Sequence, residues 1–318
     1  MIINTILLIV GFLVLIKGAD FFVEGASSTA RNFKVSKMLV GLTIVSFGTS
    51  APELAVSIKS LLSGSGDITL GNVIGSNILN ILLILGASSL IHPLAVKNNT
   101  VKKELPITLL ITALFAVLLS DSIFDNKIVN TFTRSDGVVL LLFFLVFIYY
   151  LISMMRNKID TKEDKDETIM KLPKAIIFTI VGIIAVVLGS NIVVDSATKI
   201  ATLLGVSQRL IALTIVALGT SLPELVTSLM ATQKGEYDIA IGNVVGSNIF
   251  NIGVVIAIPT AILGGIGAIT FSYIDILVML AATVLLWMFA FNDYKISKKE
   301  GLLFLLVFIA YYSYVILV

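Results

Sequence analysis

The chain contains no cysteine, a single histidine and few charged residues among its 318 positions. The lack of cysteine excludes disulfides, and with one histidine the ligands that zinc and other soft metals prefer are missing. Asp, Glu, Lys and Arg make up 13% of the sequence, whereas soluble domains carry roughly 25%. The formal net charge of +2 gives no support for a nucleic-acid partner. These shortages exclude an ordinary soluble domain.

Apolar residues take up the remaining space, with 57% of the sequence hydrophobic and a mean hydropathy of +1.05. Many runs reach the ~20 residues that a helix needs to cross a bilayer. The first run, Ile2 to Ile16, has no basic residue before it and no cleavage site soon after it, so we expect a retained span. The pattern predicts an all-α membrane protein with ten spans, at 2–25, 38–63, 67–91, 104–122, 136–155, 172–198, 206–232, 238–264, 273–292 and 300–318.

The two halves of the chain repeat each other at an offset of 171 positions. Asp67 to Ile81 is identical to Asp238 to Ile252 at 11 of 15 positions, and the offset persists to Glu104 and Asp275. Such self-similarity predicts a repeat architecture. We therefore divide the chain into a first repeat at 1–155 with its motif at 41–80, a cytoplasmic polar linker at 156–171, and a second repeat at 172–318 with its motif at 212–251.

Each repeat has five predicted spans, an odd number, so the second repeat must enter the membrane with the opposite orientation. Basic residues test this topology, because they gather in cytoplasmic loops. With the N-terminus outside, sixteen of the 22 Lys and Arg fall in inner loops and four in outer loops. We therefore expect two inverted five-helix repeats in the plasma membrane, with both termini outside.

The second predicted span of each repeat carries Gly-Thr-Ser-x-Pro-Glu, at 48–53 and 219–224. A carboxylate at membrane depth costs about 2.5–3.5 kcal/mol on insertion scales, so its default interpretation is functional. Proline removes a backbone donor and disrupts the helix. The carbonyls around Ser46–Gly48 and Ala217–Gly219 should therefore be freed, and irregular backbone at this depth lines a cavity or is buried in protein.

Further polar residues recur at helical spacing around these two glutamates. Thr49 lies four positions before Glu53 and should share its face, as Thr220 should with Glu224. The third span of each repeat adds a polar stripe, and its members are Asn72, Ser76 and Asn80 in the first repeat and Asn243, Ser247 and Asn251 in the second. Meeting at midplane, these groups would form an all-oxygen shell suited to a hard cation such as Ca²⁺, which takes 6–8 oxygens.

The motifs at 48–53 and 219–224, with Gly-Asn-Val-x-Gly-Ser-Asn-Ile-x-Asn at 71–80 and 242–251, resemble the paired repeats of the sodium/calcium exchanger family in the cation/Ca²⁺ antiporter superfamily. The resemblance implies ten helices and a site that takes Na⁺ and Ca²⁺ by turns. It implies no enzyme activity, no cofactor and no protein partner. The implied metal ligands are Thr49, Ser50, Glu53, Ser76, Asn80, Thr220, Ser221, Glu224, Ser247 and Asn251, with the backbone carbonyls of Ser46 and Ala217.

One ligand position departs from part of the family. Some members have aspartate where this chain has Asn251. The asparagine leaves the site with one acid fewer, and this argues against K⁺ co-transport. Three other functions stay open. A Ca²⁺/H⁺ exchanger would not need Na⁺, a cation channel would ring its pore by oligomeric symmetry, and an intramembrane aspartyl protease would need two acids that share a proton. The motif Gly-Thr-Ser-x-Pro-Glu favours Na⁺/Ca²⁺ antiport over the proton-coupled exchanger and the protease, and the internal repeat favours it over the channel.

Overall fold

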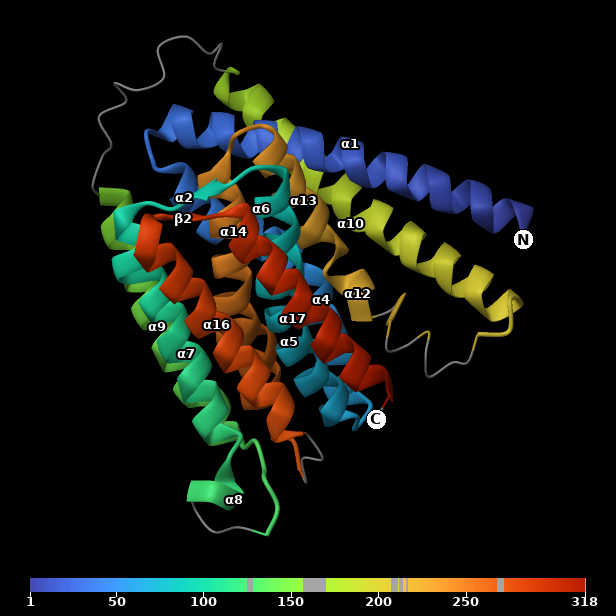
Figure 1. The fold of residues 1–318 in the computed structure, drawn as a ribbon, viewed down its shortest axis with the longest axis vertical. Helices are drawn as coiled ribbons and strands as arrows, with labels where there is room; N and C mark the ends of the chain where they lie inside the picture. The colour runs from blue at the N-terminus through green and yellow to red at the C-terminus, as the bar shows by residue number, and fades with distance from the viewer. Residues whose placement is uncertain are drawn as a thin grey trace.

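Most of the chain forms α-helix, as its apolar runs predict, and the helices pack as a bundle that two long helices cross on one side (Figure 1). This computed structural model describes residues 1–124, 128–156, 170–206, 211, 214–215, 217–267 and 272–317. Most of the predicted linker, and part of the span predicted at 206–232, lie outside the described residues.

Seven helices are long and apolar enough to cross a membrane, and each coincides with a predicted span. An eighth candidate is a bent pair, Lys37–Thr49 with Ala51–Leu62. The seven are α1 (Ile2–Phe33), the run Gly66–Ile91 that contains α5 (Gly66–Leu79) and α6 (Gly86–Ile91), α9 (Arg134–Arg156), α10 (Leu172–Leu203), the run Tyr237–Leu263 that contains α14 (Tyr237–Phe250) and α15 (Ala257–Leu263), α16 (Tyr273–Asp293) and α17 (Lys298–Leu317).

Two predicted spans are matched by shorter helices. The span at 104–122 corresponds to α7 (Leu105–Leu118), which a wider π-helical turn, η3 (Thr100–Glu104), precedes. The span at 206–232 corresponds, within the described residues, to α12 (Ala217–Thr220) and α13 (Leu222–Gln233). The all-helical membrane class is therefore confirmed, while the count of ten spans stays a prediction.

Helix α1 is longer than the predicted 2–25. It continues to Phe33, and Lys34 ends it in the left-handed region at φ 56°. The charged residues in its second half lowered the hydropathy there, but they do not end the helix because they have ionic partners. Asp20 lies 2.5 Å from Lys234 Nζ, and Glu24 lies 3.7 Å from the same amine.

The helices α1 and α10 run antiparallel and side by side, apart from the main bundle for much of their length (Figure 1). Glycine allows this close packing. A Cβ at Gly18 would lie 2.8 Å from the Val186 amide nitrogen, and one at Gly189 would lie 2.6 Å from the Leu15 amide nitrogen. The two backbones therefore touch, as small residues permit in membrane helices.

The third helical run of each repeat contains a π-helical segment at the same place. These segments are η2 (Asn80–Leu85), between α5 and α6, and η5 (Asn251–Ile256), between α14 and α15. Their starting residues are related by the offset of 171, so the repeat extends from sequence to backbone geometry. Such wider turns occur often at functional sites.

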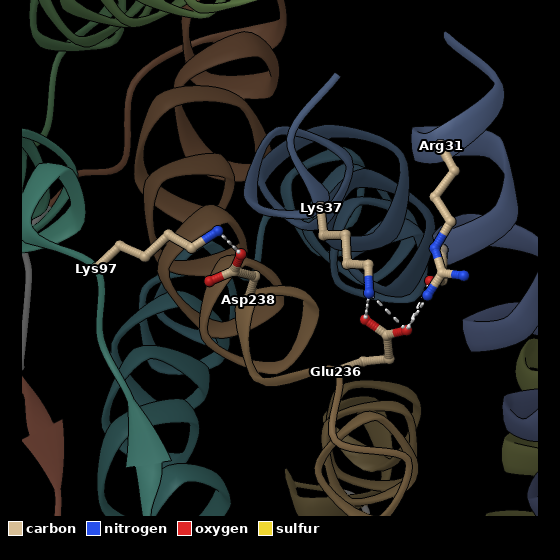
Figure 2. A network of polar contacts seen from close by, with 6 residues as sticks. Arg31, Lys37, Lys97, Glu236 and Asp238 are labelled. Carbon is tan, nitrogen blue, oxygen red and sulfur yellow. Dashed lines mark hydrogen bonds and ion pairs between the residues drawn. The ribbon is translucent and has the colours of Figure 1, made fainter. Parts of the chain in front are cut away.

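The end of the bundle next to the linker is held by polar contacts. Asn32 Nδ2 donates to the Met170 carbonyl, and strand β1 (Leu94–Ala95) pairs antiparallel with β2 (Lys295–Ile296). Figure 2 shows the ion pairs at this end, where Lys37 and Arg31 approach Glu236 at 2.8 and 3.7 Å, and Lys97 lies 2.6 Å from Asp238. At the other end, helix α8 (Asp121–Phe124) lies in the loop after α7.

Candidate functional site

The second helix of the first repeat breaks one residue before its Ala-Pro-Glu sequence. The helical segments α2 (Lys37–Val40), η1 (Gly41–Val45) and α3 (Ser46–Thr49) precede Ser50, and α4 (Ala51–Leu62) follows it at a bend of 44°. Ser221 occupies the same place between α12 and α13, and its backbone angles, −88° and 4°, nearly equal those of Ser50, −82° and 4°. The predicted proline-linked break is therefore confirmed in both repeats.

The prediction of freed carbonyls needs one correction. The Ser46 carbonyl is not unpaired, because the Ser50 amide donates to it at 3.0 Å and the Thr49 hydroxyl at 3.3 Å. Proline instead deprives the carbonyl four residues before it of a donor, which is that of Gly48 or Gly219. The Ser190 hydroxyl of α10 donates to the Gly219 carbonyl at 3.0 Å.

Glu53 and Glu224 lie in the first turns of α4 and α13, and each is 1% exposed. The N-terminal end of a helix favours a negative charge, so the break creates a favourable position for each carboxylate. The two carboxylates are also close enough for their charges to repel each other. The structure therefore brings together two acids that are 171 positions apart in the chain.

Each glutamate has hydroxyl groups of the opposite repeat beside it. Ser50 Oγ donates to Glu224 Oε1 at 3.2 Å, the Thr49 hydroxyl also faces Glu224, and the Thr220 hydroxyl faces Glu53. Thr49 also donates to Asn243 Oδ1 of the other repeat at 3.0 Å, while its shared helix face with Glu53 stays a prediction. Pairing across the repeats means that neither half can form the site alone.

Contacts of the third helical runs complete this cross-repeat arrangement. Ser221 Oγ donates to Ser76 Oγ at 3.3 Å. Helix α4 packs on η5 and α13 packs on η2, so each glutamate-bearing helix contacts the π-helical segment of the other repeat. Asn80 and Asn251 are the first residues of those segments, and each is 1% exposed.

Asn72 and Asn243 attach each third helix to the glutamate-bearing helix of its own repeat. Asn72 Nδ2 donates to the Glu53 carbonyl at 3.1 Å and to Ser57 Oγ at 3.3 Å. Asn243 Nδ2 makes the matching bonds to the Glu224 carbonyl at 3.3 Å and to Ser228 Oγ at 2.9 Å. Neither serine was among the predicted site residues, although each follows its glutamate by four positions and so lies on the same helix face.

Several oxygens at this place are buried and accept no hydrogen bond within the described part of the chain. A buried polar group without a partner costs roughly 1–3 kcal/mol, and more if it is charged, so this concentration of unpaired acceptors calls for a donor or a cation. These atoms are both carboxylate oxygens of Glu53, Oε2 of Glu224, Oγ of Ser247, and Oδ1 of Asn80 and Asn251.

These oxygens are ligands that suit a hard cation. They belong to two carboxylates, amides and hydroxyls, which Ca²⁺ and Na⁺ can both bind. Among the residues that the structure describes, no three His, Cys, Asp or Glu side chains come together. Thr49, Ser50, Ser76 and Ser221 are buried, and Thr220 is half-buried. Ala217, the last of the expected ligands, begins α12, and its side chain lies outside the described residues.

Comparisons with known proteins show which family this chain resembles. The family model described as sodium/calcium exchanger protein matches residues 3–153 and 174–317. The inner membrane protein YrbG of Escherichia coli is 36% identical over 95% of this chain and 92% of its own length, and the sodium/calcium exchanger MaX1 of Methanosarcina acetivorans is 29% identical over 97% of each chain. A solved structure of the sodium-calcium exchanger NCX_Mj superposes with a TM-score of 0.83 at 34% identity, covering 97% of both chains.

Proposed function

This chain belongs to the sodium/calcium exchanger family, and we propose that it is a secondary active antiporter that exchanges Na⁺ for Ca²⁺ at the site between its two repeats. The observation that carries the proposal is the set of buried, unpaired oxygens around Glu53 and Glu224. A Ca²⁺ ion there would neutralise both carboxylates and take its remaining ligands from the neutral oxygens. Two Na⁺ ions would balance the same charge, and a third would leave a single positive charge.

Charge balance explains why exchange would be coupled. An empty site holds two negative charges in a medium of low dielectric constant, and closing it off from water on both sides is costly. A site loaded with Ca²⁺ or Na⁺ has no such excess charge and can be enclosed. The protein would therefore change its access side when loaded, so that Na⁺ moving down its gradient drives Ca²⁺ the other way.

We assign the moving part to α1 and α10. They pack on each other through Gly18 and Gly189 and contact the main bundle at α2, α3, α12 and α13. The remaining helices of the two inverted five-helix repeats, at 1–155 and 172–318, would hold the site still. Sliding of the pair along the broken helices would expose the site to one side and then to the other.

The excess of basic residues at one end of the predicted spans sets the orientation we propose. Both termini would lie on the outer side of the plasma membrane, and the linker at 156–171 would lie in the cytoplasm. The ion-paired end in Figure 2 lies next to the linker and would therefore be the cytoplasmic end.

A flux measurement tests the exchange. The purified protein is reconstituted into liposomes loaded with Na⁺, and ⁴⁵Ca²⁺ uptake is followed after dilution into a Na⁺-free medium. We expect uptake that requires the outward Na⁺ gradient and disappears when choline replaces the internal Na⁺. Uptake driven equally well by an outward proton gradient without Na⁺ would instead identify a Ca²⁺/H⁺ exchanger.

A second measurement separates the antiporter from a channel. In a planar bilayer, an antiporter gives no unitary currents, because each turnover requires a conformational change. Stepwise single-channel currents carried by Na⁺ or Ca²⁺ would contradict the proposal and favour a cation channel.

A further inference from the structure

Four buried asparagines meet where the third helices of the two repeats cross. They are Asn77 and Asn80 from one repeat and Asn248 and Asn251 from the other, and each is no more than 2% exposed. The members of each repeat are related to those of the other by the offset of 171. Asn80 and Asn251 are among the expected cation ligands, while Asn77 and Asn248 have no assigned role.

Hydrogen bonds fix the direction of the Asn248 amide. Its Nδ2 donates to the backbone carbonyl of Asn77 at 3.4 Å. A carbonyl oxygen can only accept, so the Asn248 side chain cannot turn its own oxygen toward it. Asn248 Oδ1 is therefore held on the other side, where it accepts a hydrogen bond from Asn80 Nδ2 at 2.9 Å.

The direction of the Asn80 amide follows from that of Asn248. Because Asn248 presents an acceptor, Asn80 must turn its NH₂ group toward it, and its Oδ1 then points away. That oxygen is one of the buried atoms that accept no hydrogen bond from the described residues. Asn80 Oδ1 is thus left without a donor because the NH₂ group of the same side chain is bonded to Asn248.

In the second repeat, Asn77 directs the amide of Asn251 in the same way, but its own amide is held by a weaker contact. Asn251 Nδ2 donates to Asn77 Oδ1 at 3.2 Å, and Asn77 Nδ2 lies 3.9 Å from the sulfur of Met279. A thioether has no donor and accepts weakly, so it sets the same direction with less energy than a carbonyl. The Oδ1 atom of Asn251 is also buried and unpaired within the described part of the chain.

We propose that Asn248 and Asn77 are positioning residues, which hold the amides of Asn80 and Asn251 so that an oxygen and not an NH₂ group faces the bound cation. The two ends of an amide have nearly the same shape, so packing alone discriminates poorly between them. A flipped amide would present a donor to the cation and repel it. This inference rests on the proposed function, because it concerns the affinity of the same site for Ca²⁺.

An aspartate at either ligand position would not need this help. Its two carboxylate oxygens are equivalent acceptors, so a turn of the side chain about its last bond still presents an oxygen to the cation. The positioning residue should therefore matter when its partner is asparagine and lose its importance when the partner is aspartate. This difference separates positioning from a general contribution to folding.

A double-mutant cycle tests the inference. Asn248→Leu is made in the natural chain and in the Asn80→Asp background, and the affinity for ⁴⁵Ca²⁺ is measured on purified protein. We expect Asn248→Leu to weaken Ca²⁺ binding at least tenfold in the natural chain, and by less than threefold in the Asn80→Asp background. An equal loss in the two backgrounds would overturn the inference.

Controls separate the possible failures. Thr112→Val removes a buried hydroxyl of α7 that bonds to the Thr108 carbonyl of its own helix, and its Ca²⁺ affinity should equal that of the natural chain. If Asn248→Leu does not fold, the mirrored cycle of Asn77→Leu and Asn251→Asp gives the same test, with a smaller expected loss. If the natural chain binds no Ca²⁺, the proposed function fails together with the inference. Normal binding with equal losses overturns the inference alone.

Discussion

At the scale of single residues, burial of Glu53 and Glu224 in one site costs free energy, because both carboxylates leave water. Each is 1% exposed, and three of their four carboxylate oxygens accept no hydrogen bond from the described residues. Helix N-termini and hydroxyls of the opposite repeat offset part of this cost. In the proposed exchanger, a bound cation would relieve the rest of this cost, and we attribute the expected affinity to these incompletely satisfied oxygens.

Replacement of either glutamate by glutamine should abolish exchange. Glu53→Gln or Glu224→Gln leaves a single negative charge for a divalent ion, and loss of one partner of a buried charge pair costs about 3–5 kcal/mol, or more than ~100-fold in affinity. Na⁺-dependent ⁴⁵Ca²⁺ uptake into liposomes measures the effect. The matched control is Glu24→Gln on α1, whose carboxylate is half exposed. Normal exchange by Glu53→Gln would remove that residue from the site.

The two acids could be predicted from the sequence, but their neighbours in the other repeat could not. Periodicity relates residues of one helix, so it pairs Thr49 with Glu53. It cannot predict that Thr49 lies beside Glu224 and donates to Asn243 Oδ1, because both of these residues belong to the other repeat. Ser228, four residues after Glu224, could have been found by the same periodicity.

At the scale of the elements, the structure contains interrupted helices and continuous helices. The helices that carry the site are interrupted, by the break at Ser50 and by the π-helical segment at Asn80 in the first repeat and their counterparts in the second. The helices α1 and α10 are uninterrupted over 32 residues each and meet through glycine. In the proposed exchanger, the interrupted helices would hold the ions, and the two continuous helices would move as a unit.

The glycine contact should be sensitive to a single methyl group. Gly189→Ala would place a Cβ 2.6 Å from the Leu15 amide nitrogen, so α1 must shift. Overpacking of this kind costs about 1–3 kcal/mol, and we expect a lower melting temperature and slower exchange. In the matched control Gly75→Ala the new Cβ has no neighbour within 4 Å, so its melting temperature should not fall. Equal melting temperatures for the two variants would contradict the packing argument.

At the scale of the whole molecule, ion pairs close the linker end of the bundle. Glu236, in the turn before α14, pairs with Arg31 of α1 and Lys37 of α2 (Figure 2). It also accepts a 2.7 Å hydrogen bond from Ser27 of α1. The position that mirrors Glu236 in the first repeat is Ser65. The repeat symmetry is therefore broken here, where charges on one half find partners on the other.

Loss of this carboxylate should destabilise the folded protein. Glu236→Gln leaves Arg31 and Lys37 without their shared anion, at a cost of about 2 kcal/mol, because these side chains are largely but not fully buried. Thermal unfolding in detergent measures the change. In the control Lys97→Gln, the lysine that pairs with Asp238 is 63% exposed, so its loss should cost less than ~0.5 kcal/mol. A control loss as large as that of Glu236→Gln would contradict this ranking.

The topology can be tested directly because the chain has no cysteine. Single cysteines are introduced as Ser135→Cys and Lys171→Cys, both at exposed positions near opposite ends of the bundle. In intact cells, an impermeant maleimide should label the first variant and not the second. Permeabilised cells, in which both should react, provide the control. The reverse pattern would place the termini in the cytoplasm.

The sequence by itself determined the class, the repeat and the two acids. Hydropathy identifies a membrane helix because an unpaired backbone is too costly in lipid, so most predicted spans coincide with helices. The offset of 171 located matching motifs, and the cost of a carboxylate in an apolar run singled out Glu53 and Glu224. All three conclusions depend on properties of one segment at a time.

The tertiary structure alone decided which groups face one another. The contacts of Ser50 with Glu224 and of Asn80 with Asn248 join residues more than 160 positions apart, and nothing in a single helix specifies them. The length of α1 was also decided this way, because Lys234 pairs with Asp20 from the turn that follows α13. Long-range pairing of polar groups depends on how helices cross, and the crossing is set by close packing over the whole molecule.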